Sequence, residues 1–458
     1  MATSDLGRSY TVQKELMASP GKHLSRFGLA VAAFVGAIFL AAQSALALDI
    51  SFRSFSSSAA IGPPADEYAA KLLSTSTTVL GKAKQVKFTK YAPTPAISKE
   101  FKDIVAAVGA GGPLAGGKGF DAAYTSGSDL NPAWGFIYNS GVPFGPNFDE
   151  FMGFLYGKSI DGKETGLDLL QQILDRSGKN IVAVPIVGSS QQGSGYFMLP
   201  VGNVGSTVGI GLSGLCQQNW TFRYLPPAQF VLDRACDKLV TRGVIPKKNI
   251  KFITAIAGGG SLVKAVVDGQ IQAYEFATPL DDFSQLFGLP EGNPGTVGTR
   301  YLHFPGWHQQ FLVTYLIINK KVWNKLSPAQ QVLVMSVARD HMISSYGENL
   351  RQQGAKLKEI LTANDGDKIA ENDLVLVQWP ESDLALLRDE TIQFLNARSS
   401  EANLSEQDRK DYSTILESLR KYVSSNNGYW KVREVPNTLR FQGWYDPEGK
   451  NSWDQKLK

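Results

Sequence analysis

Strand-like and helix-like segments alternate along most of this chain, and that alternation is its strongest constraint on fold. Short apolar or alternating strand patterns lie at 50–55, 86–88, 120–124, 181–186, 250–253 and 271–276. Helical patterns separate them at 65–73, 96–108, 166–177, 229–240 and 258–267. Such alternation is typical of βαβ units, in which helices cover a mostly parallel sheet. The length of 458 residues suits one large or two moderate domains, so we expect an α/β protein.

The N-terminus carries an export signal. A continuous apolar run from Phe27 to Ala42 follows the basic residues Lys22 and Arg26, and it leads to the small-residue sequence Ala45-Leu46-Ala47. This order is that of a secretory signal peptide, so we expect residues 1–47 to be removed and the rest to reach the periplasm. An uncleaved membrane anchor is the alternative, but the run is shorter than the ~20 residues that a span needs.

The charge balance excludes one class of partner. The formal net charge is +4, with 46 basic and 42 acidic residues. Residues 1–47 contain four of these basic and two of these acidic residues, which leaves +2 for the remainder. With no basic stripe, we expect no nucleic-acid partner.

The chain has two cysteines, Cys216 and Cys236. In an oxidising compartment two cysteines twenty residues apart are candidates for a disulfide, which we expect here. Two unrelated buried thiols are the alternative, and the spacing does not suggest a metal site.

The stretch from Asp268 to Gln310 is the most informative part of the sequence. It reads D-G-Q-I-Q-A-Y-E-F-A-T-P, then a glycine- and proline-rich insert, then Y-L-H-F-P-G-W-H-Q-Q. Glu275 and Phe276 stand at the tip of a predicted strand, just before Pro279. The carboxyl end of a strand is where an α/β protein places a ligand.

These motifs resemble those of one receptor family. Q-I-Q-A-Y-E-F-A-T-P resembles the G-x-I-D-A-x-E-W-x-x-P motif of the DctP-like periplasmic solute receptors of tripartite (TRAP-type) transporters. L-H-F-P-G-W-H-Q-Q and L-I-I-N-K-K-V-W-N-K-L-S-P-A-Q-Q are similar to their Y-x-P-G-W-H-E-P and L-x-x-N-K-x-x-W-x-x-L-P-P-x-x-Q. The resemblance spans roughly residues 50–360, is strongest at 271–331, and is closest to the receptors for 2-oxo acids and lactate.

The resemblance implies a two-lobed, type II periplasmic binding protein fold with a long helix across both lobes, here at 332–360. It places lobe I at 48–178, with return segments after about residue 300, and lobe II at 179–300. Crossover strands and long helices follow at 301–398. Residues 399–458 extend beyond the family pattern. This extension could pack on the body, join a dimer interface or dock on a membrane partner.

The resemblance also implies a ligand site. F-R-Y-L-P matches the family's arginine segment and assigns Arg223 to the ligand carboxylate, a role that suits the planar guanidinium. Q-Q-G-S-G-Y-F and the segment before P-F-G add Gln192 and Tyr138, and Phe276 and Gln309 complete the ligand set. The structural alternatives are a surface arginine for Arg223, an ordinary loop around Gln192 and a packed aromatic ring for Tyr138.

In some of these receptors a sodium or calcium ion bridges protein and ligand. The matching positions here are Gln192, Glu275, Phe276 and Gln309. Phe276 replaces a tryptophan and Gln309 a glutamate, which removes one negative charge, although an amide oxygen still binds a hard cation. The resemblance implies no required cofactor, only an optional cation.

The implied function is capture of a small 2-oxo or hydroxy monocarboxylate by lobe closure and delivery to the membrane permease subunits, without enzyme chemistry. A C4-dicarboxylate is the alternative ligand. An exported enzyme is a less favoured function, because His308 is the only candidate base and H-E-x-x-H and G-x-S-x-G motifs are absent. An interaction protein that uses the aromatic tail is a third hypothesis. Pairing through the C-terminal helices would make a homodimer.

Overall fold

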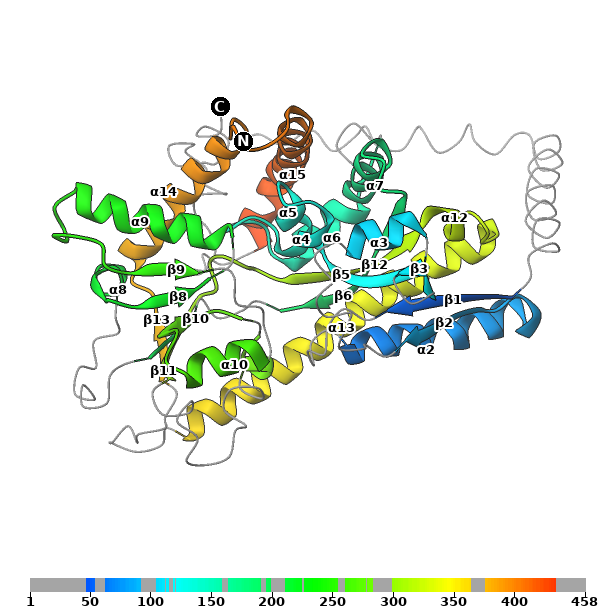
Figure 1. The fold of residues 1–458 in the computed structure, drawn as a ribbon, viewed down its shortest axis with the longest axis horizontal. Helices are drawn as coiled ribbons and strands as arrows, with labels where there is room; N and C mark the ends of the chain where they lie inside the picture. Colours follow the sequence, from blue (N-terminus) through cyan, green and yellow to red (C-terminus); the bar gives the residue numbers. More distant parts are fainter. Residues whose placement is uncertain are drawn as a thin grey trace, which may run out of the picture.

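The computed structural model describes residues 47–53, 62–91, 104–111, 113–114, 118–119, 121–158, 164–190, 195–198, 211–224, 226–253, 260–276, 278–282, 299–363 and 375–433. Nearly all of the predicted signal peptide, Gln192 and the end of the C-terminal extension lie outside these ranges. Within them, two sheets form the framework of the molecule (Figure 1).

The first sheet has the strand order β2-β1-β5-β12-β6. Its strands are β1 (Leu48–Arg53), β2 (Val86–Tyr91), β5 (Ala122–Ser126), β6 (Ile181–Ser189) and β12 (Leu312–Asn319). β1 runs parallel to β2 and β5, whereas β12 is antiparallel to both β5 and β6. Helices connect the parallel strands: α2 (Gly62–Leu80) lies between β1 and β2, and α3 (Ile104–Ala110) precedes β5. The predicted α/β architecture is therefore confirmed.

The second sheet has the order β13-β11-β7-β10-β8-β9. Its strands are β7 (Gly195–Met198), β8 (Thr221–Arg223), β9 (Lys251–Ile253), β10 (Ala273–Tyr274), β11 (Thr299–Phe304) and β13 (Val375–Gln378). β8 is parallel to both β9 and β10. Between these strands lie α8 (Leu212–Gln217), α9 (Ala228–Thr241) and α10 (Gly260–Val267), and α11 (Pro279–Asp282) follows β10.

One long helix connects the regions of the two sheets. α13 (Pro328–Ala363) begins beside α12 (Lys320–Trp323), passes below the first sheet and ends near α10 (Figure 1). It packs against β6 and α2 along its first part and against α11 and β13 of the second region. This is the helix across both lobes that the sequence predicts at 332–360.

The chain crosses between the sheets at positions that differ from the expected boundaries. β6 belongs to the first sheet and β7 to the second, so the first crossing follows Ser189 instead of residue 178. All nine residues of β6 are buried, because α7 (Gly166–Arg176) and α13 cover the strand, which accounts for its continuous apolar sequence. The second crossing, at residues 305–311, joins β11 to β12.

The C-terminal helices pack on the body of the molecule. α14 (Glu381–Arg398) lies against α9, and α15 (Glu406–Arg433) lies against α7 and α6 (Phe148–Tyr156). Arg176 of α7 pairs with Asp411 of α15 at 2.5 Å, and Asn131 Nδ2 donates to Asp408 Oδ1 at 2.8 Å. Of the three roles considered for residues 399–458, packing on the body is the one that the described part shows.

The expected disulfide is present. Cys216 of α8 and Cys236 of α9 are fully buried and joined to each other, with Cα atoms 5.5 Å apart. The bond ties together two helices that pack beside the second sheet. Among the described residues no helix is both long enough and apolar enough to cross a membrane.

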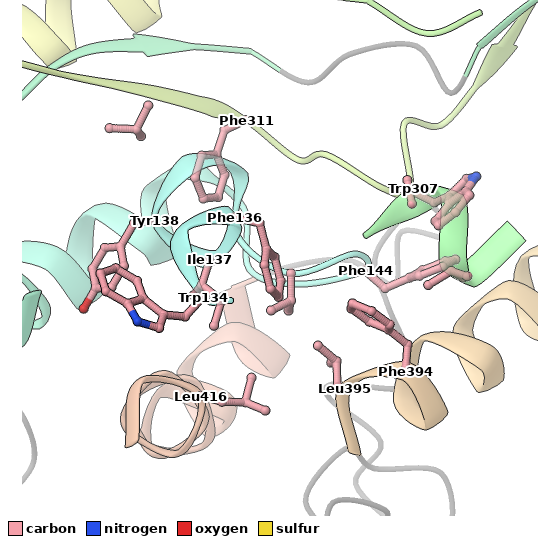
Figure 2. Packing of buried hydrophobic residues seen from close by; sticks show 14 of the residues in the cluster. Trp134, Phe136, Ile137, Tyr138, Phe144, Trp307, Phe311, Phe394, Leu395 and Leu416 are labelled. Atoms are coloured by element: carbon pink, nitrogen blue, oxygen red, sulfur yellow. The ribbon is translucent and has the colours of Figure 1, made fainter. Parts of the chain in front are cut away.

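The largest apolar cluster extends through both regions of the molecule. It contains α5 (Gly135–Ser140) and α6 beside the first sheet, α8 and α9 beside the second, and the inner faces of α14 and α15. Figure 2 shows the aromatic part of this cluster, with Trp134 and Tyr138 at one end and Phe144 and Trp307 at the other. A continuous core holds the two sheet regions together and fixes the segments that connect them.

Candidate functional site

The pairing of β8 with β10 places Arg223 beside Glu275. These short strands are parallel, with Tyr274 opposite Arg223, so both chains leave the sheet at the same edge. The amide of Glu275 donates to the carbonyl of Arg223 at 3.1 Å, which fixes the backbone there. Residues 52 positions apart in sequence thus meet at the carboxyl ends of two neighbouring strands, the usual place for a ligand site in such a sheet.

Arg223 is almost completely buried, with 3% of its surface exposed. One guanidinium nitrogen, Nη1, donates to the carbonyl oxygen of Glu275 and lies 3.1 Å from its carboxylate oxygen Oε2. The guanidinium also lies over the ring of Phe276, 5.9 Å from its centroid. The positively charged guanidinium is therefore held by a carboxylate and an aromatic face, which offset part of the cost of burying its charge.

The second crossing brings another part of the chain to this pair. His308 Nε2 lies 3.8 Å from Glu275 Oε1, and both side chains are buried. The amide of Phe144 donates to the carbonyl of Trp307 at 2.7 Å, and the Trp307 and Phe144 rings stack with centroids 5.5 Å apart (Figure 2). Trp307 therefore holds the crossing segment against the loop that precedes α6.

Tyr224 connects the crossing segment to β8. Its ring lies 5.1 Å from the His308 ring and 6.2 Å, edge-on, from the Trp307 ring. Burial raises the pKa of the Tyr224 hydroxyl well above its ordinary value, and the negative charge of Glu275 adds to the effect. The hydroxyl therefore keeps its proton at neutral pH and is available as a donor.

Several buried polar atoms in this cluster have no hydrogen-bond partner among the described residues. They are Glu275 Oε1, both ring nitrogens of His308, Trp307 Nε1 and the Tyr224 hydroxyl. Leaving a buried polar group unpaired costs about 1–3 kcal/mol, so native proteins concentrate such groups where water, an ion or a ligand completes them. This concentration marks the region around Arg223, Glu275 and His308 as the candidate binding site.

The predicted site residues fall into three groups. Arg223, Glu275 and Phe276 lie together. Gln309 follows His308 in the same turn and is 9% exposed, and its backbone N–H donates to the carbonyl of Gly306. Gln192 lies outside the described residues. Tyr138 lies elsewhere.

Tyr138 packs in the core of α5 and α6. Its ring contacts Trp134, Phe151 and Phe154, and its hydroxyl donates to the carbonyl of Gly166 at 2.9 Å. Figure 2 shows it at the opposite end of the aromatic cluster from Trp307. The structure thus gives Tyr138 the packing role that was the alternative to ligand contact.

Sequence reasoning did not place Tyr224, Trp307 or His308 in the site. Tyr224 directly follows the predicted Arg223 in sequence, but no motif or charge singles it out. The sequence singles out His308 only as the candidate base of an exported enzyme. Only its position between the two sheets shows that its Nε2 faces the carboxylate of Glu275.

The donor set suits a hard cation only in part. Glu275 Oε1 is an unpartnered carboxylate oxygen and Gln309 brings an amide oxygen, both of the kind that sodium and calcium prefer. The neighbouring guanidinium of Arg223 opposes a second positive charge there. Within the described ranges no group of three or more His, Cys, Asp or Glu side chains gathers as a metal site.

A separate groove of about 790 Å³ lies between α15, the end of α14 and the segment that joins α6 to α7. Tyr412, Glu417 and Tyr422 are among its lining residues. None of the predicted site residues lines it, so it is distinct from the cluster around Arg223.

The sequence matches no protein-family model and no curated protein. Solved structures do match. One is a TRAP transporter solute-binding protein from Bordetella bronchiseptica with calcium and picolinate, at 15% identity, covering 85% of this chain and 94% of that one with a TM-score of 0.58. A TRAP periplasmic solute-binding protein from Pseudoalteromonas atlantica with sodium and pyruvate matches at 14% identity, 84% and 96% coverage, and a TM-score of 0.60.

A third match is a TRAP periplasmic solute-binding protein from Colwellia psychrerythraea with calcium and pyruvate, at 16% identity, 84% and 96% coverage, and a TM-score of 0.59. At such low identity these likenesses concern the fold. With its two sheets joined by crossing segments and one long helix, the chain has the α/β, two-lobed fold of the periplasmic solute-binding proteins of TRAP transporters.

Proposed function

We propose that this protein is an extracytoplasmic receptor that captures a small organic acid and delivers it to a TRAP-type permease. The observation that carries the proposal is the buried Arg223 at the carboxyl end of β8, surrounded by polar atoms that lack partners in the described structure. A binding protein needs such a preformed set of donors, and the fold is that of proteins whose solved examples hold pyruvate or picolinate.

Arg223 is the anchor for the ligand carboxylate. A guanidinium carries five donors in a fixed fork, so an arginine that already bonds Glu275 still has the chemistry to bind a carboxylate in a second direction. Phe276, across the guanidinium, gives one wall of the site. Gln309 and Gln192 complete the proposed ligand set, as their positions in the family motifs imply.

Binding is coupled to the relative position of the lobes. We assign the first lobe to the first sheet, with residues 48–189 and the return strand β12, and the second lobe to residues 195–304 with β13. The segment that carries Trp307 and His308 runs between the sheets, so a ligand that contacts His308 acts directly on a connection between the lobes. Closure around a ligand is the signal that a permease reads, and no bond chemistry is required.

A sodium or calcium ion is an optional part of the complex. Glu275 Oε1 and the Gln309 amide would contribute oxygen ligands, and the acid would supply further oxygens. The Colwellia and Pseudoalteromonas proteins hold pyruvate together with calcium or sodium. Gln309 stands where the family has a glutamate, and the loss of that negative charge weakens cation binding here. We therefore propose that the acid binds without a cation and that a cation only adds affinity.

The proposed location is the periplasm, after cleavage of residues 1–47, with permease subunits as the partner. A homodimer is a further proposal, and the Bordetella bronchiseptica structure is described as a dimer.

A thermal-shift screen of residues 48–458 against small mono- and dicarboxylic acids tests the receptor function. Each acid is tested with and without calcium or sodium. A ligand at ~100 times its dissociation constant stabilises the folded protein by roughly 2.7 kcal/mol, which raises the melting temperature measurably. A shift with one acid supports the receptor and separates monocarboxylates from C4-dicarboxylates. If well-folded protein shows no shift with any acid, the receptor function is wrong.

A further inference from the structure

Glu275 and His308 face each other across a gap that neither side chain closes. Their nearest atoms, Oε1 and Nε2, are 3.8 Å apart, beyond the ~3.2 Å limit of a good hydrogen bond. Both atoms are buried and without a hydrogen-bond partner in the described part of the chain. The other carboxylate oxygen, Oε2, is bound to Arg223, so Glu275 is fixed with Oε1 directed to the gap.

A hydroxyl group fits this gap in size and in hydrogen-bonding character. An oxygen at roughly 2.7–2.9 Å from each atom can bridge two groups that are 3.8 Å apart. A hydroxyl can donate its proton to the carboxylate of Glu275 and accept from the Nε2–H of His308 at the same time. A ketone oxygen only accepts, so it can pair with His308 but leaves Glu275 Oε1 unpaired.

The neighbouring unpartnered atoms require acceptors. The Tyr224 hydroxyl and Trp307 Nε1 are buried beside His308, and both can donate. With Arg223, the cluster thus presents several donors, and Glu275 Oε1 is its unpaired carboxylate acceptor beside the imidazole nitrogen of His308 that carries no proton. Its complement is a ligand that has several acceptor oxygens and a hydroxyl donor, which describes a hydroxylated carboxylate.

We propose that the Glu275–His308 gap selects a 2-hydroxy acid over the 2-oxo acid of the same carbon skeleton. The inference rests on the proposed receptor function and names its substrate class more closely. A cation bound to Glu275 would replace the missing donor, so sodium or calcium should strengthen binding of the 2-oxo acid more than binding of the 2-hydroxy acid. His308 and Glu275 are then the specificity-determining residues, and Arg223 binds both kinds of acid.

The test is calorimetric titration of residues 48–458 with two matched pairs, lactate with pyruvate and 2-hydroxyglutarate with 2-oxoglutarate. The buffer contains a chelator and potassium in place of sodium. In the pair that binds, we expect the 2-hydroxy acid to bind about ten- to a hundred-fold more tightly than its 2-oxo partner. This difference is the cost of one unpaired buried acceptor. Adding calcium or sodium should reduce this difference in affinity, because the cation strengthens binding of the 2-oxo acid.

Equal affinities, or tighter binding of the 2-oxo acid without cation, would overturn the inference while leaving the receptor function intact. Binding of neither pair, together with a negative thermal-shift screen, would overturn the receptor function itself. The two failures are therefore distinguishable.

A substitution can reverse the preference. Glu275→Gln puts an amide N–H₂ within reach of the gap, which pairs with a ketone oxygen, so the hydroxy/oxo affinity ratio should fall at least ten-fold. Glu390→Gln is the matched control, because Glu390 is also a buried glutamate paired with an arginine, Arg234, but lies on α14. The hydroxy/oxo affinity ratio of this control variant should equal that of the unchanged protein. If Glu275→Gln does not fold, the ratio in the unchanged protein still decides the inference.

Discussion

Arg223 and Glu275 hold each other at the ends of two adjacent parallel strands, with Nη1 and Oε2 3.1 Å apart and both side chains at most 3% exposed. A buried ion pair contributes little net stability, because desolvation offsets the attraction. Removing one partner is costly, since the other charge is then buried alone. The pair therefore fits a binding site better than a stabilising element.

Arg223→Lys should abolish acid binding while the protein stays folded. Lysine keeps the positive charge beside Glu275 but loses the planar fork that binds a carboxylate with two parallel bonds. We expect affinity for the ligand found in the screen to fall at least a hundred-fold by calorimetry. Arg234→Lys, at the half-exposed pair with Glu390, is the control and should bind normally. Normal binding by Arg223→Lys would contradict the assignment of the anchor.

Tyr138→Phe should reduce stability and leave affinity unchanged. The substitution removes the hydroxyl that donates to Gly166 and leaves that carbonyl without this bond, at a cost of about 1 kcal/mol. Urea unfolding and ligand titration of the same variant measure the two effects. A large loss of affinity at normal stability would return Tyr138 to the ligand site.

Reduction of the disulfide should destabilise the protein. Cys216 and Cys236 close a loop of about 20 residues, for which the chain-entropy estimate is ~3 kcal/mol. Urea unfolding with and without reductant should show a lower midpoint in the reduced protein. Because both cysteines are fully buried, reduction should need partial unfolding and proceed slowly in native buffer. A Cys216→Ala/Cys236→Ala variant that unfolds at the original midpoint would contradict this account.

Gly153→Ala should weaken the packing of α15. A Cβ atom at Gly153 would collide with the hydroxyl of Tyr422, so α6 and α15 would have to separate or the tyrosine move. We expect a loss of 1–3 kcal/mol, typical of overpacking, in urea unfolding. Gly354→Ala in α13 is the control, because a Cβ there meets no atom within 4 Å and alanine favours the helix by ~1 kcal/mol. Equal free energies of unfolding for the two variants would contradict the close contact.

Acidification below neutral pH should destabilise the protein through His341. Burial lowers the pKa of this α13 histidine below its ordinary value, although its bond to the Pro64 carbonyl and the charges of Glu67 and Asp340 act the other way. The unfolded chain then binds the proton more readily than the native state. Stability therefore falls as the pH drops through the histidine pKa of the unfolded chain, ~6.5, toward the lower pKa of the folded protein. Melting temperatures from pH 7.5 to 5 measure the loss, and His341→Gln should reduce it.

Local patterns predicted much of the fold. The helix expected at 166–177 is α7, which begins after a Thr165 cap and ends at Arg176, and the strand expected at 181–186 is β6. Periodicity and capping act within a few residues, which is why they are readable. The sheet to which β6 belongs was not readable, because its partner is β12, more than a hundred residues later.

The site residues that the sequence predicted correctly as neighbours lie in motifs that include the end of a strand. Arg223, Glu275 and Phe276 sit in segments that resemble the receptor family's motifs, and that resemblance suggested their meeting, although their ligand role stays a prediction. Tyr224 and His308 join them through contacts between segments about 85 residues apart, which depend on how the crossing segment is packed. The same limit explains Tyr138, which is close to its motif in sequence but is drawn into the core by Phe151 and Phe154.

Phe394 of α14 touches both halves of the molecule, stacking 6.0 Å from Phe230 of α9 and lying 6.2 Å from Phe136 of α5. Any motion that swings α9 away from α5 must break one of these ring contacts, so under the proposed receptor function the C-terminal helices would bias the equilibrium between open and closed lobes. The apparent dissociation constant of a ligand is its intrinsic value divided by the fraction of molecules already competent to bind. Phe394→Ala would shift that fraction, and affinity would change at a residue that never meets the ligand.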